Sequence, residues 1–117
     1  MSTQALADAF EKGTGKQWTQ PIGFVHSLFE VAADVLKRAK NIDDKASIRD
    51  AIAATNLNTI VGQLAWGKGP VKNVAKTPLV GGQWVKGKKN KFDLAIVNNE
   101  TAPSIPTTAK LKPISYS

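Results

Sequence analysis

Apolar residues recur with helical spacing in the first part of the chain. Within residues 3–12, Leu6, Ala9 and Phe10 fall at positions i, i+3 and i+4, which is the spacing of one helix face. Gly13 and Gly15 follow, and glycine commonly ends a helix because it tolerates a positive φ angle. The pattern therefore predicts a first helix over residues 3–12.

The second helical pattern is the longest and runs from residue 22 or 24 to residue 40. Its apolar residues form two neighbouring stripes, which together make a face wider than a single helix contact needs. Such a face suits a helix that lies on a sheet with another helix alongside. One stripe consists of Phe24, Leu28, Val31, Val35 and Ala39, and the other of Val25, Phe29, Ala32 and Leu36.

A third, shorter helix is predicted over residues 45–55. Ile48, Ala51 and Ile52 form its apolar stripe, and Asp43 or Asp44 can cap its first turn. Residues 56–58 are then expected to link this helix to the first strand.

Strand patterns follow the helices. We expect strands over residues 59–66, 82–86 and 92–98, with an irregular connection over residues 68–78. The last two strands are separated by the sequence GKKN, which is compatible with the tip of a hairpin. Beyond residue 100, three prolines exclude regular structure and leave an extended tail, on which Ile105, Leu111 or Ile114 can still pack.

Three helices and a few C-terminal strands place the chain in the α/β class, but they make an incomplete layer. Each helix has an apolar face, and few strands are available to cover those faces. We infer that the chain relies on segments outside this sequence or on a second copy of itself. Self-association of the isolated chain is therefore expected.

Composition excludes several classes of protein. A chain of 117 residues has room for one domain at most, and its apolar content of 42% excludes wholesale disorder. Cysteine is absent, which excludes a disulfide framework, thiolate metal sites and cysteine catalysis. No apolar run approaches the roughly 20 residues that span a bilayer. The first residues lack the basic-then-apolar order of a secretory signal peptide, so we expect none in this chain.

The net charge of +7 lies entirely in the C-terminal half. Residues 1–67 contain as many basic as acidic residues, whereas nine lysines from Lys68 onward face only Asp93 and Glu100. The region from Lys68 to Lys91 is therefore the candidate surface if the chain is a basic module that binds nucleic acid or another polyanion. Its lysine-rich end over residues 86–91 also fits a solvated hairpin tip, which discourages strand pairing between molecules.

Candidate catalytic groups are few. His26 is the only histidine and has Glu30 one turn on, so a solvated ion pair is the favoured interpretation. Asp43 and Asp44 are better explained as a helix cap than as a pair of catalytic carboxylates. We predict no catalytic residue, no metal site and no cofactor, and hence no enzyme.

Three tryptophans, Trp18, Trp66 and Trp84, could stack on bases while the lysines contact phosphates. However, they are far apart in the sequence, and two of them lie in predicted strands. Core packing is therefore the favoured role for them.

Several segments resemble a known family. They are GFVHSLFEVAADVLKRA (residues 23–39), DDKASIRDAIAATNLNTIVGQLAW (residues 43–66) and PLVGGQW (residues 78–84). In order and spacing they resemble the C-terminal part of the branched-chain amino acid type of solute-binding protein, the extracytoplasmic (type I periplasmic) receptor of an ABC importer. The similarity extends over residues 5–98 but corresponds only to the last part of a family member.

The resemblance implies an incomplete piece of a two-lobed periplasmic-binding-protein fold, in which a solute binds between the lobes. Residues 1–67 would be the helical part of the first lobe with its last strand, and residues 68–78 a hinge connection. Residues 79–100 would join the second lobe, and residues 101–117 would be a proline-containing tail. The full-length parent would be periplasmic or otherwise extracytoplasmic, with ABC permease subunits as partners.

Phe24 is the one ligand-binding residue that the resemblance implies. It matches an aromatic residue that lies at the mouth of the solute cleft in this family, although a core position on its helix is the alternative. The solute would be an amino acid, an amide or an aromatic acid. Nucleic acid is a partner only under the alternative hypothesis of a basic module.

Overall fold

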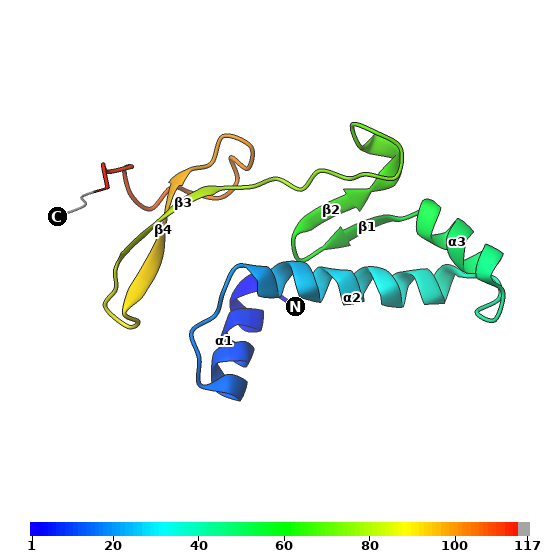
Figure 1. The fold of residues 1–117 in the computed structure, drawn as a ribbon, viewed down its shortest axis with the longest axis horizontal. Coiled ribbons are helices and arrows are strands. Elements are labelled where there is room, and N and C mark those ends of the chain that lie inside the picture. Colours follow the sequence, from blue (N-terminus) through cyan, green and yellow to red (C-terminus); the bar gives the residue numbers. More distant parts are fainter. Residues whose placement is uncertain (115–117) are drawn as a thin grey trace. The chain divides into compact units, whose positions relative to one another are not determined.

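The computed structural model describes residues 1–114. Within them the chain is mixed α/β, with three α-helices and two separate two-stranded antiparallel sheets (Figure 1). The chain divides into two compact units, Met1–Thr77 and Pro78–Ser117. The first unit contains all three helices and one sheet, and the second contains the other sheet.

The three predicted helices are confirmed, with shifted ends. They are α1 (Thr3–Thr14), α2 (Pro21–Arg38) and α3 (Lys45–Ala53). Gly15 ends α1 in the left-handed conformation, with a φ of 67°. Of the two candidate caps of α3, Asp44 is the one used, because its carboxylate accepts hydrogen bonds from the backbone N–H groups of Ala46 and Ser47 at 3.0 and 3.2 Å.

The predicted single strand over residues 59–66 is wrong. The structure has a hairpin instead, formed by β1 (Asn56–Thr59) and β2 (Gly62–Ala65), and a short 3₁₀-helix, η1 (Trp66–Lys68), follows it. The turn at Ile60 and Val61 lacks the residues that usually mark turns. Gly62 makes the turn possible, because its φ of 102° lies in a region that glycine tolerates.

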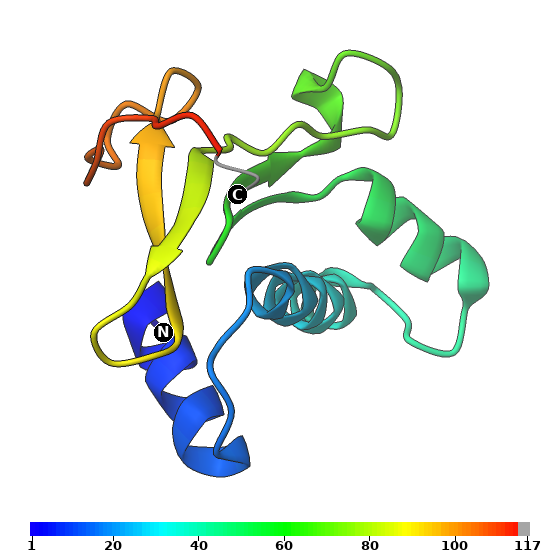
Figure 2. The same ribbon diagram turned by 60° about the vertical axis from the view of Figure 1, so that its left-hand side comes forward.

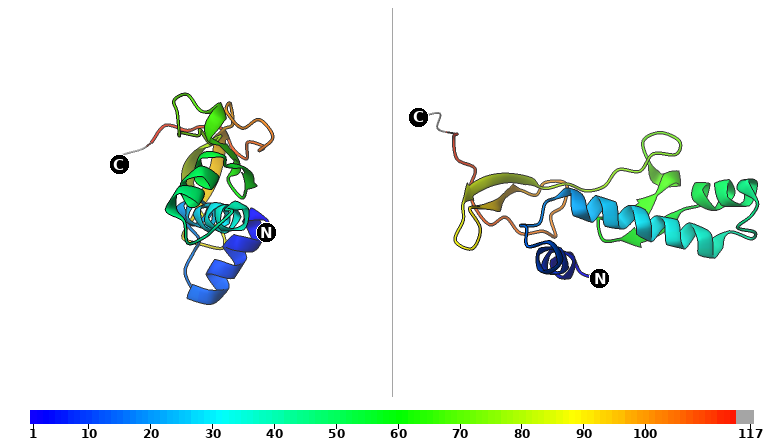
Figure 3. Two further views of the ribbon diagram at one scale, coloured as in Figure 1. Left: turned by 90° about the vertical axis from the view of Figure 1, so that its right-hand side faces the viewer. Right: turned by 60° about the horizontal axis from the view of Figure 1, so that its bottom comes forward.

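Both α3 and the β1–β2 hairpin lie on one side of α2 (Figures 1 and 2), and α3 lies beside the C-terminal part of α2 (Figure 3). The buried apolar residues of this unit are Val35 of α2, Ala51 of α3, and Leu64 and Ala65 of β2. None of them is among the largest side chains. The inner stripe of α2 thus makes a small core with its neighbours.

Two polar side chains of α2 fasten this arrangement. The guanidinium of Arg38 donates to the backbone carbonyl of Ala51 at 2.9 Å and to the hydroxyl of Thr55 at 3.1 Å, and it also pairs with Asp34 at 2.7 Å. The carboxylate of Glu30 accepts a 2.9 Å hydrogen bond from the backbone N–H of Ile60, in the hairpin turn. The helix therefore holds both α3 and the hairpin through directed contacts.

The outer face of α2 is uncovered within this unit. It consists of Val25, Leu28, Phe29 and Leu36, whose exposed fractions are 55%, 66%, 68% and 54%. These residues belong mostly to the second of the two stripes, so the unit covers only part of the wide apolar face. Contiguous apolar patches of this kind mark interaction surfaces in soluble proteins.

The second unit is built on a hairpin that the sequence predicts correctly. β3 (Gly81–Lys86) pairs antiparallel with β4 (Phe92–Asn98), and a lysine-rich tip joins them. At that tip the backbone N–H of Gly87 donates to the carbonyl of Lys91 at 3.2 Å. Ala95 and Ala102 are the buried apolar residues of the described part of this unit.

The tail after β4 is irregular, as its prolines require, and hydrogen bonds hold it together with the burial of Ala102. Ile96 and Thr108 exchange hydrogen bonds, and the side chain of Gln83 bonds both backbone groups of Lys112. The expected packing of the tail is not seen, since Ile105, Leu111 and Ile114 are 43%, 72% and 69% exposed, respectively.

Replacing Arg38 by alanine is expected to destabilise the first unit by about 1–3 kcal/mol, because it leaves the buried Thr55 and the carbonyl of Ala51 without this partner. Arg49→Ala is the matched control, because Arg49 is 73% exposed and pairs with its neighbour Asp50. Its effect should stay within about 0.5 kcal/mol. Urea unfolding followed by circular dichroism at one protein concentration measures both. Equal midpoints for the two variants would contradict the role given to Arg38.

The uncovered face of α2 predicts that the isolated chain self-associates. Sedimentation at several concentrations should show a mass that rises with concentration, because association removes these side chains from water. Leu28→Gln combined with Phe29→Gln should abolish the rise, whereas Lys37→Gln, on another side of the same helix, should leave it intact. A monomer at all concentrations would contradict this prediction.

Candidate functional site

Phe24, the predicted ligand-binding residue, lies in the first turns of α2 and is 40% exposed. It is therefore neither a buried core residue nor part of an enclosed site within its unit. The hollow at the loop after β2 and the hollow on α3 are lined by other residues. Its role in a solute cleft stays a prediction.

His26 and Glu30 form the expected pair, with 3.8 Å between the imidazole Nε2 and a carboxylate oxygen. The pair is half-buried rather than fully solvated, since the two side chains are 31% and 29% exposed. The second carboxylate oxygen of Glu30 accepts from Ile60 of the hairpin turn. This environment gives the two residues a structural role.

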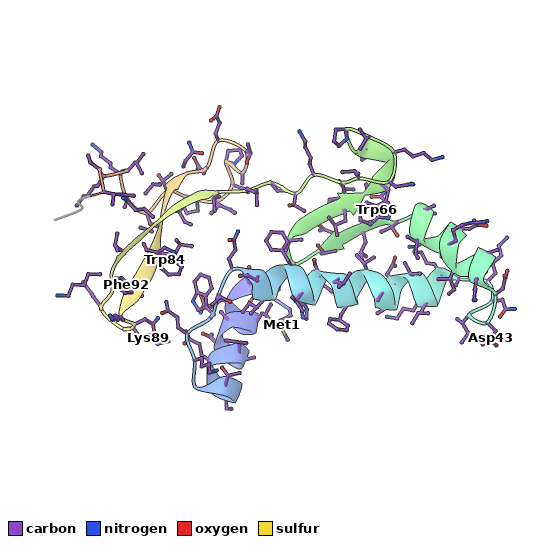
Figure 4. The ribbon with its side chains drawn as sticks, viewed as in Figure 1. Met1, Asp43, Trp66, Trp84, Lys89 and Phe92 are labelled. Atoms are coloured by element: carbon purple, nitrogen blue, oxygen red, sulfur yellow. The ribbon has the colours of Figure 1, made fainter. Side chains whose placement is uncertain are left out.

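The three tryptophans have different surroundings, and none of them is fully buried. Trp66, the first residue of η1 (labelled in Figure 4), has its indole Nε1 buried without a hydrogen-bond partner in the described structure. Trp84, in β3, is 54% exposed. The prediction of core packing is therefore wrong for Trp84 within its unit.

One face of the β3–β4 hairpin combines aromatic and basic residues. Trp84 pairs with Leu94 across the strands, and Lys86 pairs with Phe92, so these four side chains share one side of the sheet. Phe92 is 48% exposed, and the ammonium of Lys91 lies 5.7 Å from the centre of its ring. Figure 4 shows Trp84 and Phe92 on the same hairpin, with Lys89 at its tip.

The first unit has a hollow at the loop that follows β2 and another on α3. The larger, of about 390 Å³, lies at the loop that follows β2, and we call it the loop hollow. A smaller one, of about 290 Å³, lies on α3 and the turn before it. The loop hollow is lined by Gln63, Ala65, Lys68, Gly69, Pro70, Ala75 and Lys76. The smaller hollow is lined by Ile42, Lys45, Ile48, Arg49 and Ile52.

The loop hollow is the feature that sequence reasoning missed. Residues 68–78 were predicted to be an irregular connection, because their pattern is neither helical nor alternating, and their lysines were considered only as part of the basic region from Lys68 to Lys91. The regular spacing of Lys68, Lys72 and Lys76 is a signal in the sequence, but it does not tell which of the three share a hollow. The conformation of the loop determines that Lys68 and Lys76 line the hollow and Lys72 does not.

Within residues 1–114, no group of three or more histidine, aspartate or glutamate side chains is placed to hold a metal ion. No helix among the described residues has the length and apolar character needed to cross a membrane. Asp43 and Asp44 belong to the start of α3, where Asp44 caps the helix.

Comparison of the chain with protein-family models, with curated proteins and with solved structures finds no match.

Proposed function

We propose that this chain is the C-terminal region of an extracytoplasmic solute-binding receptor of the branched-chain amino acid type, which delivers a small solute to the permease of an ABC importer. The observation that carries the proposal is the uncovered outer face of α2, on which four large apolar side chains are each more than half exposed. In a larger α/β lobe, a neighbouring layer would remove these side chains from water. The resemblance of residues 5–98 to the end of such a receptor is consistent with that missing layer.

The division of the chain supports the same proposal. The boundary between the compact units lies between Thr77 and Pro78, at the end of the segment for which the resemblance implies a hinge. Between η1 and β3 the described chain has no helix or strand. A two-lobed receptor needs connections of this kind, because its lobes move relative to each other when they close around a solute.

Under this proposal the chain binds and does not catalyse. A receptor holds a small solute by enclosing it on most sides and by a few fixed polar groups. This chain would supply one flank of the cleft, with Phe24 as an apolar contact. The groups that hold the carboxylate or ammonium of an amino acid, an amide or an aromatic acid would come from the remainder of the receptor.

The DNA directly upstream tests the proposal. It is expected to encode an α/β segment that completes both lobes, either in frame or as a separate reading frame. Co-purification of that product with this chain should yield a complex that binds an amino acid or an aromatic acid in a calorimetric titration. An upstream region without such a coding sequence would contradict the proposal.

In that complex, Phe24→Ala should weaken solute binding by about 1–3 kcal/mol, because an apolar contact is lost from the cleft. Ile42→Ala is the control, since Ile42 is exposed and lies outside both α2 and its outer face. Calorimetric titration gives the affinities, and thermal unfolding shows whether each variant is folded. An unchanged affinity with a lowered melting temperature would assign Phe24 to the core and remove it from the site.

The aromatic and basic face of the β3–β4 hairpin favours a second candidate function, which is binding of nucleic acid or another polyanion. Exposed aromatic rings stack on bases, and neighbouring lysines contact phosphates. Trp84 and Lys86 lie on one face of β3, and the lysines of the hairpin tip are adjacent in sequence. This candidate accounts for the basic half of the chain but not for the uncovered face of α2.

Fluorescence anisotropy with random-sequence single-stranded DNA tests the second candidate. If it is right, affinity should fall steeply as salt rises, because lysine contacts release counterions, and Trp84→Ala should weaken binding. Trp18→Ala is the matched control, because Trp18 lies outside the hairpin. Absence of binding near physiological salt would exclude this function.

A further inference from the structure

The conformation of the loop after β2 forms the loop hollow. Its loop leaves β2 through η1 and closes on itself, so that a Cβ at Gly69 would overlap the carbonyl of Val74. Asn73 has a φ of 64°, and the N–H of Val74 donates to the carbonyl of Val71 at 3.2 Å. This closure brings Lys68 and Lys76 to the same hollow.

The polar side chains that line the loop hollow are two lysines and one glutamine. Lys68 and Lys76 bring two ammonium groups, and Gln63 brings an amide. The amide nitrogen of Gln63 donates to Asn56 at 2.8 Å and has a second N–H to offer. No carboxylate lines the hollow.

Nothing local neutralises these lysines. The sequence contains no acidic residue between Asp50 and Asp93, and the ion pairs found among residues 1–114 do not include Lys68 or Lys76. Both lysines are exposed, and an anion in the hollow would be attracted by the two positive charges.

We propose that the loop hollow binds a small organic dicarboxylate, with Lys68 and Lys76 as its counter-ions. The apolar lining by Ala65, Pro70 and Ala75 fits a carbon skeleton, and the two lysines fit a charge at each end of it. The volume of about 390 Å³ lies in the range of small-molecule sites, roughly 300–1,000 Å³. The site does not rest on the proposed receptor function, because all of its lining residues belong to the first unit of this chain.

The test is a titration of the ¹⁵N-labelled full chain with glutarate, followed by the backbone amide signals at constant ionic strength. Signals of residues 68–76 should shift and saturate, while inorganic phosphate and chloride at the same ionic strength should produce smaller shifts. Lys68→Gln combined with Lys76→Gln should raise the Kd for glutarate at least about tenfold, as expected for lost charged contacts.

Lys72→Gln is the matched control, because it removes the same charge from the same loop outside the lining of the hollow. It should change the Kd by less than about twofold. The proposal would be overturned if Lys72→Gln weakened glutarate binding as much as the double variant. It would also be overturned if the signals of residues 86–91 shifted as well, or if phosphate produced shifts as large as those of glutarate. In each variant, amide signals of residues outside the loop should be unchanged, which shows that the variant is folded. If the receptor proposal fails, the results of this titration are not affected.

Discussion

The structure depends on the removal of apolar surface on α2 from water. Burial of such surface is the main favourable term in folding, and the described chain achieves it only for the inner stripe around Val35. The side chains buried with it are small or medium in size, such as Ala51 and Leu64. The outer stripe around Phe29 faces away from α3 and the hairpin, so its burial requires another layer. Both the receptor proposal and the expected self-association follow from the lack of a layer that covers the outer face of α2.

Directed polar contacts compensate in part for the small apolar core. Arg38 reaches across to α3, and Glu30 fixes the hairpin turn, so one helix positions the other elements of its unit. In the second unit the tail is held in the same way, through Ile96 and Gln83. Each such bond contributes only about 0.5–1.5 kcal/mol, or about 1.5–3 kcal/mol when one group is charged. These contacts therefore fix the geometry of each unit and add a modest amount of stability.

Local signals predicted the helices and the second hairpin because each has its own stripe, cap or turn. Gly15 and Asp44, for example, act within one turn of the helix that they delimit. The first hairpin could not be predicted, because its turn is positioned by Glu30, thirty residues earlier. The exposure of Trp84 also escaped prediction, since burial depends on which layers are present. The loop hollow depends on the close approach of the chain to itself at Gly69, and the spacing of hydrophobic residues does not predict such an approach.

The absence of cysteine allows the central claim, that the outer face of α2 needs a cover, to be measured directly. A single cysteine at Leu28 can be compared with one at Lys37 by their rates of reaction with a thiol reagent. The account predicts that Leu28→Cys becomes protected as protein concentration rises, or when the proposed upstream lobes are added, while Lys37→Cys reacts at a constant rate. Equal and constant rates at both positions under all these conditions would contradict it.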